Sequence, residues 1–383
     1  MGFATLPRLC WGPGALEILG SLGARRVFLV VDPAVARSLR LRRIVEEFEK
    51  GGAAVTQHLV ARIEPTLESV DAAAASARSA GPDWVVAVGG GSTIDTAKAA
   101  WVGYERPEFP FAEPIPTAEL GLRARARFAA LPTTSGSGAE ASWLAQYRGA
   151  DGALVEISSR DLVADWVLLD PQLAELMPPD VTAATGADAI AHAFEAYFSP
   201  WANPFTDALA RDAIARAARD LPRVYRHGSD PELRLSMQFA ATHAGVAAAN
   251  SQLGLAHALA HAVGGEVPLP HGRLVAAVLP SVIEYNFPSV RDRLDGLPGP
   301  LGAGAAQHRS TLPERLRDLW QSLGLPRSLA EVGVPPTTLE GARDTILARA
   351  ASSSSWVGNP RVPSPTELRA VFDAAVGGRA VDV

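Results

Sequence analysis

The chain has 383 residues, of which 48% are hydrophobic and 20% charged, and its formal net charge is −6. This composition is typical of a folded globular protein and excludes an intrinsically disordered chain. The slightly acidic balance provides no basic surface, so we expect neither nucleic acid nor a membrane as a partner. Cys10 is the single cysteine, which excludes an intrachain disulfide and a cysteine-based metal site. Because the sequence shows no run of 18 apolar residues and no signal-peptide pattern, we expect a cytoplasmic protein.

The first half of the chain alternates short apolar runs with helical patterns. Runs typical of buried strands occupy residues 26–31, 83–88, 128–132 and 166–171. Alanine-rich segments with helical spacing, such as 69–80, lie between them. Strands that alternate with helices predict a mostly parallel sheet with both faces covered.

After about residue 178 the strand pattern ends. Long segments with helical spacing, rich in alanine and leucine, follow at 182–197, 204–219, 231–249 and 254–263. We therefore predict an α/β domain over residues 1–179 and an all-helical domain over 180–383. Segment 294–310 is dense in glycine and proline, which predicts a surface connection.

Three glycines separate the second predicted strand from a helical pattern. Gly89, Gly90 and Gly91 would let main-chain N–H groups approach a phosphate, and a helix N-terminus favours negative charge there. We expect Ser92 or Thr93 to cap this helix and to donate a further bond to the phosphate. An ordinary tight turn is the alternative, since the spacing fits neither the dinucleotide fingerprint nor the Walker lysine.

Polar residues also follow the first and third predicted strands, at the strand ends where ligands of open α/β sheets bind. Segment 133–138 holds four hydroxyls and two glycines, and a solvated turn is the alternative there. Asp32 ends the first strand, where its carboxylate would accept bonds from an adenosine ribose and repel a 2′-phosphate. This favours NAD(H) over NADP(H). Asp32 followed by Pro33 also fits a helix N-cap.

Ionisable residues recur at helical spacing in the second half. Asp188 and His192 are four residues apart, as are His257 and His261, so each pair projects from one helix face. His271 follows after glycines and prolines that would end the helix. All lie among apolar residues, where an unpartnered imidazole or carboxylate is costly to bury. Three imidazoles and one carboxylate suit a divalent metal such as Fe²⁺ or Zn²⁺ with an open position, and satisfied core histidines are the alternative.

Taken in order, these segments resemble the iron-containing (group III) alcohol dehydrogenase family over nearly the whole chain. One such motif would be weak, whereas the ordered set is highly specific. The motifs are Gly12-Pro13-Gly14, Gly89-Gly90-Gly91-Ser92-x-x-Asp95-x-x-Lys98, Pro132-Thr133-Thr134-Ser135-Gly136-Ser137-Gly138, Asp170-Pro171, Gly186-x-Asp188-Ala189-x-x-His192-x-x-Glu195-x-Tyr197, His257-x-x-x-His261, Pro270-His271-Gly272 and Asn359-Pro360-Arg361.

The resemblance implies an α/β dinucleotide-binding domain and a helical metal-binding domain, with the active site in the cleft between them. His261 would lie beside the metal as a substrate-side or proton-relay residue. The glycine loop would hold the pyrophosphate, and three hydroxyl residues would contact the phosphate and the nicotinamide ribose. The implied metal ligands are Asp188, His192, His257 and His271. Together with the residues argued above from the sequence, the predicted cofactor contacts are Asp32, Gly89, Gly90, Gly91, Ser92, Thr93, Thr133, Thr134 and Ser137.

The implied activity is that of a metal-dependent NAD(H)-linked alcohol dehydrogenase or aldehyde reductase, which transfers hydride between nicotinamide and an alcohol or carbonyl at one Fe²⁺ or Zn²⁺. We expect a small-molecule alcohol or aldehyde substrate and a homo-oligomer, a dimer. A specialised reductase, for example of a phosphonate-bearing aldehyde, is one alternative. A dehydroquinate synthase-type cyclase is another, but it needs several basic residues and only Lys98 lies near the motifs. A non-catalytic metal- or nucleotide-binding protein is the third.

Overall fold

A computed structural model describes residues 6–60, 65–111, 119–150, 152–267 and 269–382. The chain divides into two compact units. The first comprises Met1–Met177 with Ser229–Gln238, and the second comprises Pro178–Gly228 with Phe239–Val383. The chain first passes from one unit to the other after Met177, two residues before the boundary that the sequence suggests. Ser229–Gln238, which the sequence places in the helical part, packs instead with the first unit.

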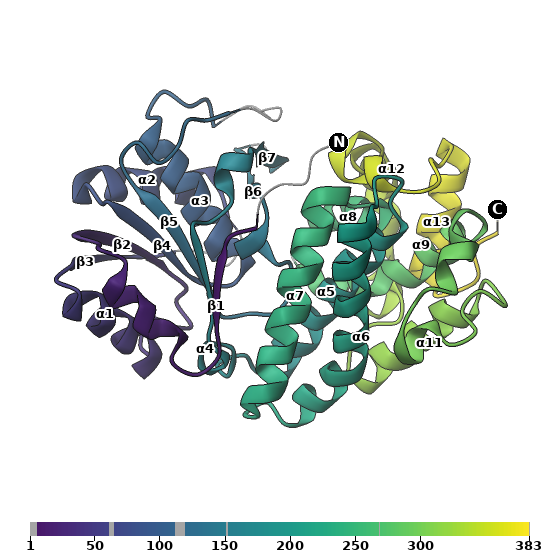
Figure 1. Ribbon diagram of the computed structural model, residues 1–383. Coiled ribbons are helices and arrows are strands. Elements are labelled where there is room, and N and C mark those ends of the chain that lie inside the picture. Colours follow the sequence, from purple (N-terminus) through teal and green to yellow (C-terminus); the bar gives the residue numbers. More distant parts are fainter. Residues whose placement is uncertain (1–5, 61–64, 112–118, 151, 268, 383) are drawn as a thin grey trace. The chain divides into compact units, whose positions relative to one another are not determined.

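A six-stranded parallel sheet forms the centre of the first unit, with strand order β1-β8-β5-β4-β2-β3 (Figure 1). Four strands match the predicted apolar runs. The two edge strands, β1 and β3, were not predicted, because their residues are half-exposed and form no continuous apolar run. An antiparallel hairpin, β6 with β7, follows β5. The strands are β1 (Arg8–Trp11), β2 (Arg26–Val31), β3 (Ala54–Leu59), β4 (Trp84–Gly89), β5 (Arg127–Pro132), β6 (Leu144–Arg148), β7 (Leu154–Ser158) and β8 (Trp166–Leu169).

Helices cover both faces of this sheet, which confirms the predicted fold class (Figure 1). Ile44 and Phe48 of α1 belong to one buried cluster with Leu29 and Val86 of the central strands. Helices α2 and α3 pack together on the other face. Successive side chains of a strand point to opposite faces of the sheet, so the apolar residues of these strands need cover on both faces. The helices of this unit are η1 (Ala15–Ser21), α1 (Leu39–Lys50), α2 (Leu67–Ala80), α3 (Gly91–Glu105), η2 (Ala139–Ala141), η3 (Arg160–Leu162) and α4 (Pro171–Ala174).

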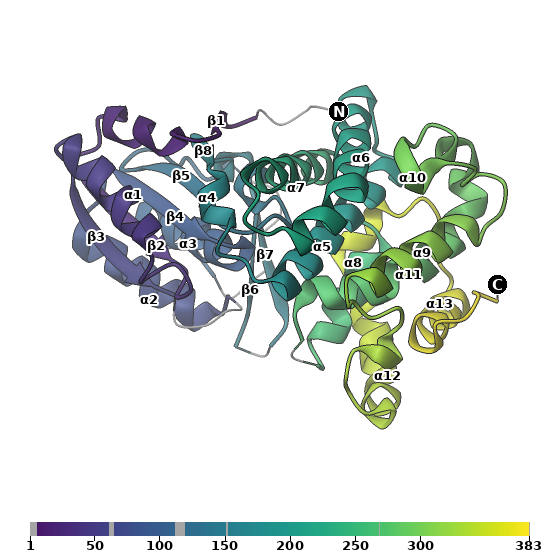
Figure 2. The same ribbon diagram turned by 90° about the horizontal axis from the view of Figure 1, so that it is seen from below.

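All regular secondary structure in the described residues of the second unit is helical. Helix α5 packs against both α6 and α9 (Figure 2). The predicted surface connection at 294–310 is partly wrong, because it contains α10 and buries Leu301 and Ala305. None of the described helices is both long and apolar enough to cross a membrane. The helices are α5 (Pro179–Phe198), α6 (Pro204–Arg226), α7 (Pro231–Ser251, shared with the first unit), α8 (Leu255–Gly264), α9 (His271–Leu294), α10 (Gly299–Gly302), α11 (Thr311–Ser322), η4 (Leu329–Glu331), α12 (Pro336–Ser352), η5 (Ser354–Gly358) and α13 (Pro365–Gly377).

Candidate active site

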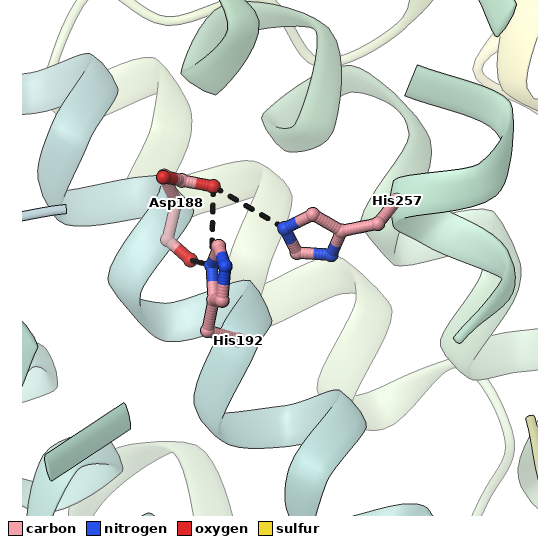
Figure 3. A group of neighbouring side chains, drawn as sticks. All are labelled: Asp188, His192 and His257. Atoms are coloured by element: carbon pink, nitrogen blue, oxygen red, sulfur yellow. Dashed lines mark hydrogen bonds and ion pairs between the residues drawn. The ribbon is translucent and has the colours of Figure 1, made fainter. Parts of the chain in front are cut away.

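Side chains from three helices of the second unit meet around one carboxylate oxygen, Oδ1 of Asp188. Asp188 and His192 lie one turn apart on α5, His257 lies on α8, and His271 is the first residue of α9. Asp188 Oδ1 is 3.3 Å from His192 Nδ1, 3.4 Å from His257 Nε2 and 3.7 Å from His271 Nε2. Figure 3 shows this oxygen facing the two buried imidazoles. The structure therefore brings together the four residues that the family resemblance implied as metal ligands.

The donor atoms of this cluster fit a metal ion. Asp188 Oδ1 and His257 Nε2 are closed off from solvent, and neither makes a hydrogen bond within the described part of the chain. Buried polar atoms are seldom left in this state. Ligand atoms about 2.0–2.2 Å from a tetrahedral metal lie roughly 3.3–3.6 Å from one another. The distances of 3.4 and 3.7 Å from Asp188 Oδ1 to Nε2 of His257 and of His271 are close to this range, whereas His192 Nδ1 also lies 2.9 Å from the Asp188 carbonyl oxygen. The His271 side chain is 38% exposed, so one side of the cluster is open.

The electrostatics of the cluster favour a cation. Burial raises the pKa of Asp188, but His192, His257 and His271 outweigh it and hold that pKa well below its usual range. Burial lowers the pKa of His257, but the carboxylates of Glu195 and Asp188 outweigh it and raise the pKa to about 9. Two ionised carboxylates in a buried site need a balancing positive charge, which protonated His257 supplies in the metal-free site and a bound metal cation would supply in its place.

Glu195 orients the imidazole of His257. The two residues approach at 2.5 Å between His257 Nδ1 and Glu195 Oε2, and the Ala256 N–H donates to Glu195 Oε1 at 2.6 Å. Burial raises the pKa of Glu195, but His257 outweighs it and lowers that pKa, so the carboxylate is ionised. An ionised carboxylate keeps the proton on Nδ1, so the proton that a metal ion would displace is the one on Nε2, the nitrogen that faces Asp188. The motif pattern alone predicts no role for Glu195, although its spacing of three from His192 places both on one helix face.

Asn359 supports the start of α8 from the C-terminal part of the chain. Its Oδ1 accepts hydrogen bonds from the Leu255 N–H at 3.2 Å and from Asn286 Nδ2 at 2.9 Å. A Cβ atom on Gly254 would lie 2.9 Å from Glu195 Oε1 and 3.1 Å from Asn359 Oδ1. Glycine at this N-cap therefore lets two side chains reach the free N–H groups at the start of the helix that carries His257.

His261 lies one turn after His257 on α8 and stacks on His271, with ring centroids 4.8 Å apart and ring planes 23° apart. Both imidazoles are half-buried, whereas Asp188, His192 and His257 are buried. His261 therefore lies on the less buried side of the cluster. The sequence predicted a place for it beside the metal.

The predicted glycine loop lies in the first unit, between β4 and α3. Helix α3 begins at Gly91, and its N-cap, Gly90, has no side chain to bond the helix. The expectation that Ser92 or Thr93 caps this helix is wrong, because both residues lie inside its first turn. A Cβ atom on Gly89 would come within 2.6 Å of the Thr93 side chain, so close packing within the loop also requires glycine there.

The second predicted loop, residues 133–138, packs on the glycine loop. Strands β4 and β5 are neighbours and pair in parallel, so the two loops leave the sheet at the same edge. A Cβ atom on Gly90 would lie 3.1 Å from the Thr134 side chain, and one on Gly91 would lie 2.7 Å from Ser137 Oγ. The missing side chains therefore make room for the hydroxyl residues of the second loop. Thr133 is buried and donates its N–H to the Gly89 carbonyl at 3.0 Å.

Asp32 directly follows β2, next to the glycine loop. Thr93 Oγ1 donates to Asp32 Oδ2 at 3.4 Å, and Oδ1 accepts the N–H of Ala34 at 2.8 Å. The alternative role as a helix N-cap is wrong, because a turn follows and α1 begins later, capped by Ser38. Asp32 and the two loops thus lie at the carboxyl ends of the adjacent strands β2, β4 and β5, where parallel sheets bind nucleotides.

Comparison with known proteins identifies a family for both parts of the chain. A family model described as "Iron-containing alcohol dehydrogenase" matches residues 7–171, and one described as "Fe-containing alcohol dehydrogenase family, C-terminal" matches residues 182–376. The chain belongs to the iron-containing alcohol dehydrogenase family. It is thus an oxidoreductase that acts on CH–OH groups, as the resemblance implied.

Relatives in this family align with the chain from end to end. A NADPH-dependent butanol dehydrogenase of Clostridium saccharobutylicum is 32% identical over 389 residues, which cover 99% of each chain. Long-chain-alcohol dehydrogenase 1 of Geobacillus thermodenitrificans is 31% identical, over 99% of this chain and 97% of the relative. The solved iron-containing alcohol dehydrogenase of Thermococcus thioreducens is 31% identical and superposes with a TM-score of 0.87, over 97% of this chain and 99% of that one.

Proposed function

We propose that this chain interconverts an alcohol and the corresponding carbonyl compound with NAD(H), using one Fe²⁺ or Zn²⁺ ion held by Asp188, His192, His257 and His271. The observation that carries the proposal is the approach of three imidazole nitrogens to within 3.3–3.7 Å of one carboxylate oxygen, Asp188 Oδ1. The bound metal would supply a Lewis acid that stabilises negative charge on the substrate oxygen.

The residues of the chain divide the remaining work. Asp188 and Glu195 provide the buried negative charge that retains a cation, and Glu195 fixes the orientation of His257. Substrate would approach from the side of His271 and His261, because these two imidazoles are the less buried ones. His261 would carry the alcohol proton toward solvent, since an imidazole accepts and releases protons near neutral pH.

The nucleotide would bind at the carboxyl ends of β2, β4 and β5. Main-chain N–H groups at the start of α3, with the hydroxyls of Thr134 and Ser137, would hold the diphosphate. Asp32 would accept the hydroxyls of the adenosine ribose. One relative is named for its use of NADPH, so the preference for NAD(H) rests on Asp32 alone.

We expect Asp32→Ala to lower the ratio of kcat/KM for NADH to that for NADPH by about tenfold or more, because it removes repulsion of a 2′-phosphate. An unchanged ratio would contradict this role.

Metal analysis combined with an activity screen tests the main proposal. Protein purified without oxygen should contain about one iron or zinc per chain and oxidise NADH with short aldehydes. A chelator should remove metal and activity together, and adding Fe²⁺ should restore both. Protein that binds metal and NADH but turns over none of the aldehydes would contradict the proposal and favour a non-catalytic binding protein. Dimeric assembly and cytoplasmic location stay predictions, and light scattering in solution tests the first.

A further inference from the structure

Lys98 is an exception in the composition of this chain. The sequence contains 35 lysine and arginine residues, and only Lys50 and Lys98 are lysines. Lys50 is exposed at the end of α1, whereas Lys98 lies on α3 with a fully buried side chain. A buried ammonium group is unfavourable unless its hydrogen-bond donors are satisfied. Its surroundings explain why this position holds lysine in a chain that otherwise uses arginine.

The Lys98 ammonium group binds three main-chain carbonyls. Nζ donates to the carbonyl oxygens of Ala139 at 2.7 Å, Ser142 at 2.7 Å and Leu144 at 3.0 Å. An ammonium group has three donors on one atom, so it can serve three carbonyls that converge on a point. The planar, larger guanidinium group of arginine cannot reproduce this arrangement. Burial lowers the pKa of Lys98 to about 8, against the opposing carboxylates of Asp95 and Glu140, so the group is charged at pH 7.

The segment that Lys98 holds follows directly on the second loop. Gly138, with φ of 64°, turns the chain from the loop into residues 139–144. The same loop touches the start of α3, where Thr134 packs on Gly90 and Ser137 on Gly91. Helix α3 therefore contacts this part of the chain at two levels, through its glycines at the first turn and through Lys98 two turns later.

We propose that Lys98 is a positioning residue that holds residues 139–144, and through them Thr134 and Ser137, against the glycine loop, and thereby sets the affinity for the nucleotide. The inference rests on the proposed nucleotide site at these loops. Lys98 itself touches the loop segment and does not take part in hydride transfer. Its loss should change nucleotide affinity without changing the metal site, which lies in the other unit.

The test compares Lys98→Arg and Lys98→Met with the wild-type metal-loaded protein. Lys50→Arg is the matched control, because the Lys50 side chain is 66% exposed and bonds Glu47 one turn earlier on its own helix. We expect amide hydrogen exchange of residues 133–144 to become about tenfold faster in both Lys98 variants, because this segment loses its anchor. The Kd for NADH, measured by fluorescence titration, should rise about tenfold, with metal content and the KM for aldehyde unchanged within about twofold. A general loss of stability would instead accelerate exchange throughout the first unit.

Unchanged exchange at 133–144, or faster exchange with an unchanged Kd for NADH, overturns the inference. A Lys98→Arg variant that behaves like wild type also overturns it, since the geometry requires an ammonium group. If Lys98→Met does not fold, Lys98→Gln replaces it with a smaller expected loss, because its amide still donates two hydrogen bonds. Wild-type protein that fails to bind NADH would refute the proposed nucleotide site, and with it the effect on affinity. The exchange measurement would still show separately whether Lys98 orders the loop.

Discussion

The two units of this protein build their candidate sites in opposite ways. The helical unit uses side chains: Asp188 and His192 meet because a helix places residues four apart on one face, and His257 reaches them from α8. The α/β unit uses main chain and missing side chains, with Gly90 and Gly91 pressed against Thr134 and Ser137. A spacing of four residues in a helix predicts which side chains lie together, whereas a glycine predicts a close approach without indicating which residue approaches. The two sites should therefore respond differently to substitution.

The largest effect should follow from removing one half-buried ligand in the helical unit. We expect His271→Ala to lower the metal content from about one ion per chain to below about a tenth, and to reduce activity at least about a thousandfold. The fold should persist, because the His271 side chain is 38% exposed. Elemental analysis, aldehyde reduction and circular dichroism on the same preparation measure the three quantities. A variant that retains full metal would show that His271 is not a ligand.

His261→Ala separates metal binding from proton transfer. His261 stacks on His271 but is assigned no metal bond, so the variant should keep its metal and lose about a hundredfold in kcat. The KM for NADH should not change, because the nucleotide loops belong to the other unit. If His261→Ala is also purified without metal, the division of roles between the two stacked imidazoles is wrong.

Glu195→Gln tests whether the metal site depends on support from outside the ligand set. The amide keeps the size of the side chain but loses the charge that holds the proton on His257 Nδ1, so metal affinity should fall about 10- to 100-fold. Competition with a chelator measures the metal Kd. Asp180→Asn is the matched control, because Asp180 is exposed in the first turn of the same helix. Equal metal affinity in Glu195→Gln and wild type would show that Glu195 only accepts the N–H groups at the start of α8 and does not support the metal site.

The sequence was sufficient for the central strands, for α5 to α8 and for the pairs Asp188–His192 and His257–His261, because each depends on local spacing or on a buried apolar run. The choice of His271 and not His261 as a ligand came from the family resemblance. The sequence did not reveal β1 and β3, since half-exposed edge strands carry no such run. The sequence also did not predict the hydrogen bonds to Asn359 that hold the start of α8. Asn359 bonds Leu255 across 104 positions and Asn286 across 73, and no local pattern predicts which distant segments pack together. The predicted cap of α3 was wrong at a place where the second loop, distant in sequence, packs on Gly90 and Gly91 at the helix start.

The smallest effect concerns that cap. Ser92 lies inside the first turn of α3 and the N-cap is Gly90, so Ser92→Ala should change the free energy of unfolding by less than about 0.5 kcal/mol. Thr66→Ala in the same unit is the comparison, because Thr66 Oγ1 accepts the N–H of Ser69 in the capping box of α2, and losing a cap costs about 1 kcal/mol. Denaturant titration of both variants measures the difference. If Ser92 donates to a bound phosphate, the same variant should bind NADH about two- to tenfold more weakly while its stability stays unchanged. A Ser92→Ala variant as destabilised as Thr66→Ala would show that Ser92 has a structural role. The α/β unit would then depend on a side chain at this position, as the helical unit does.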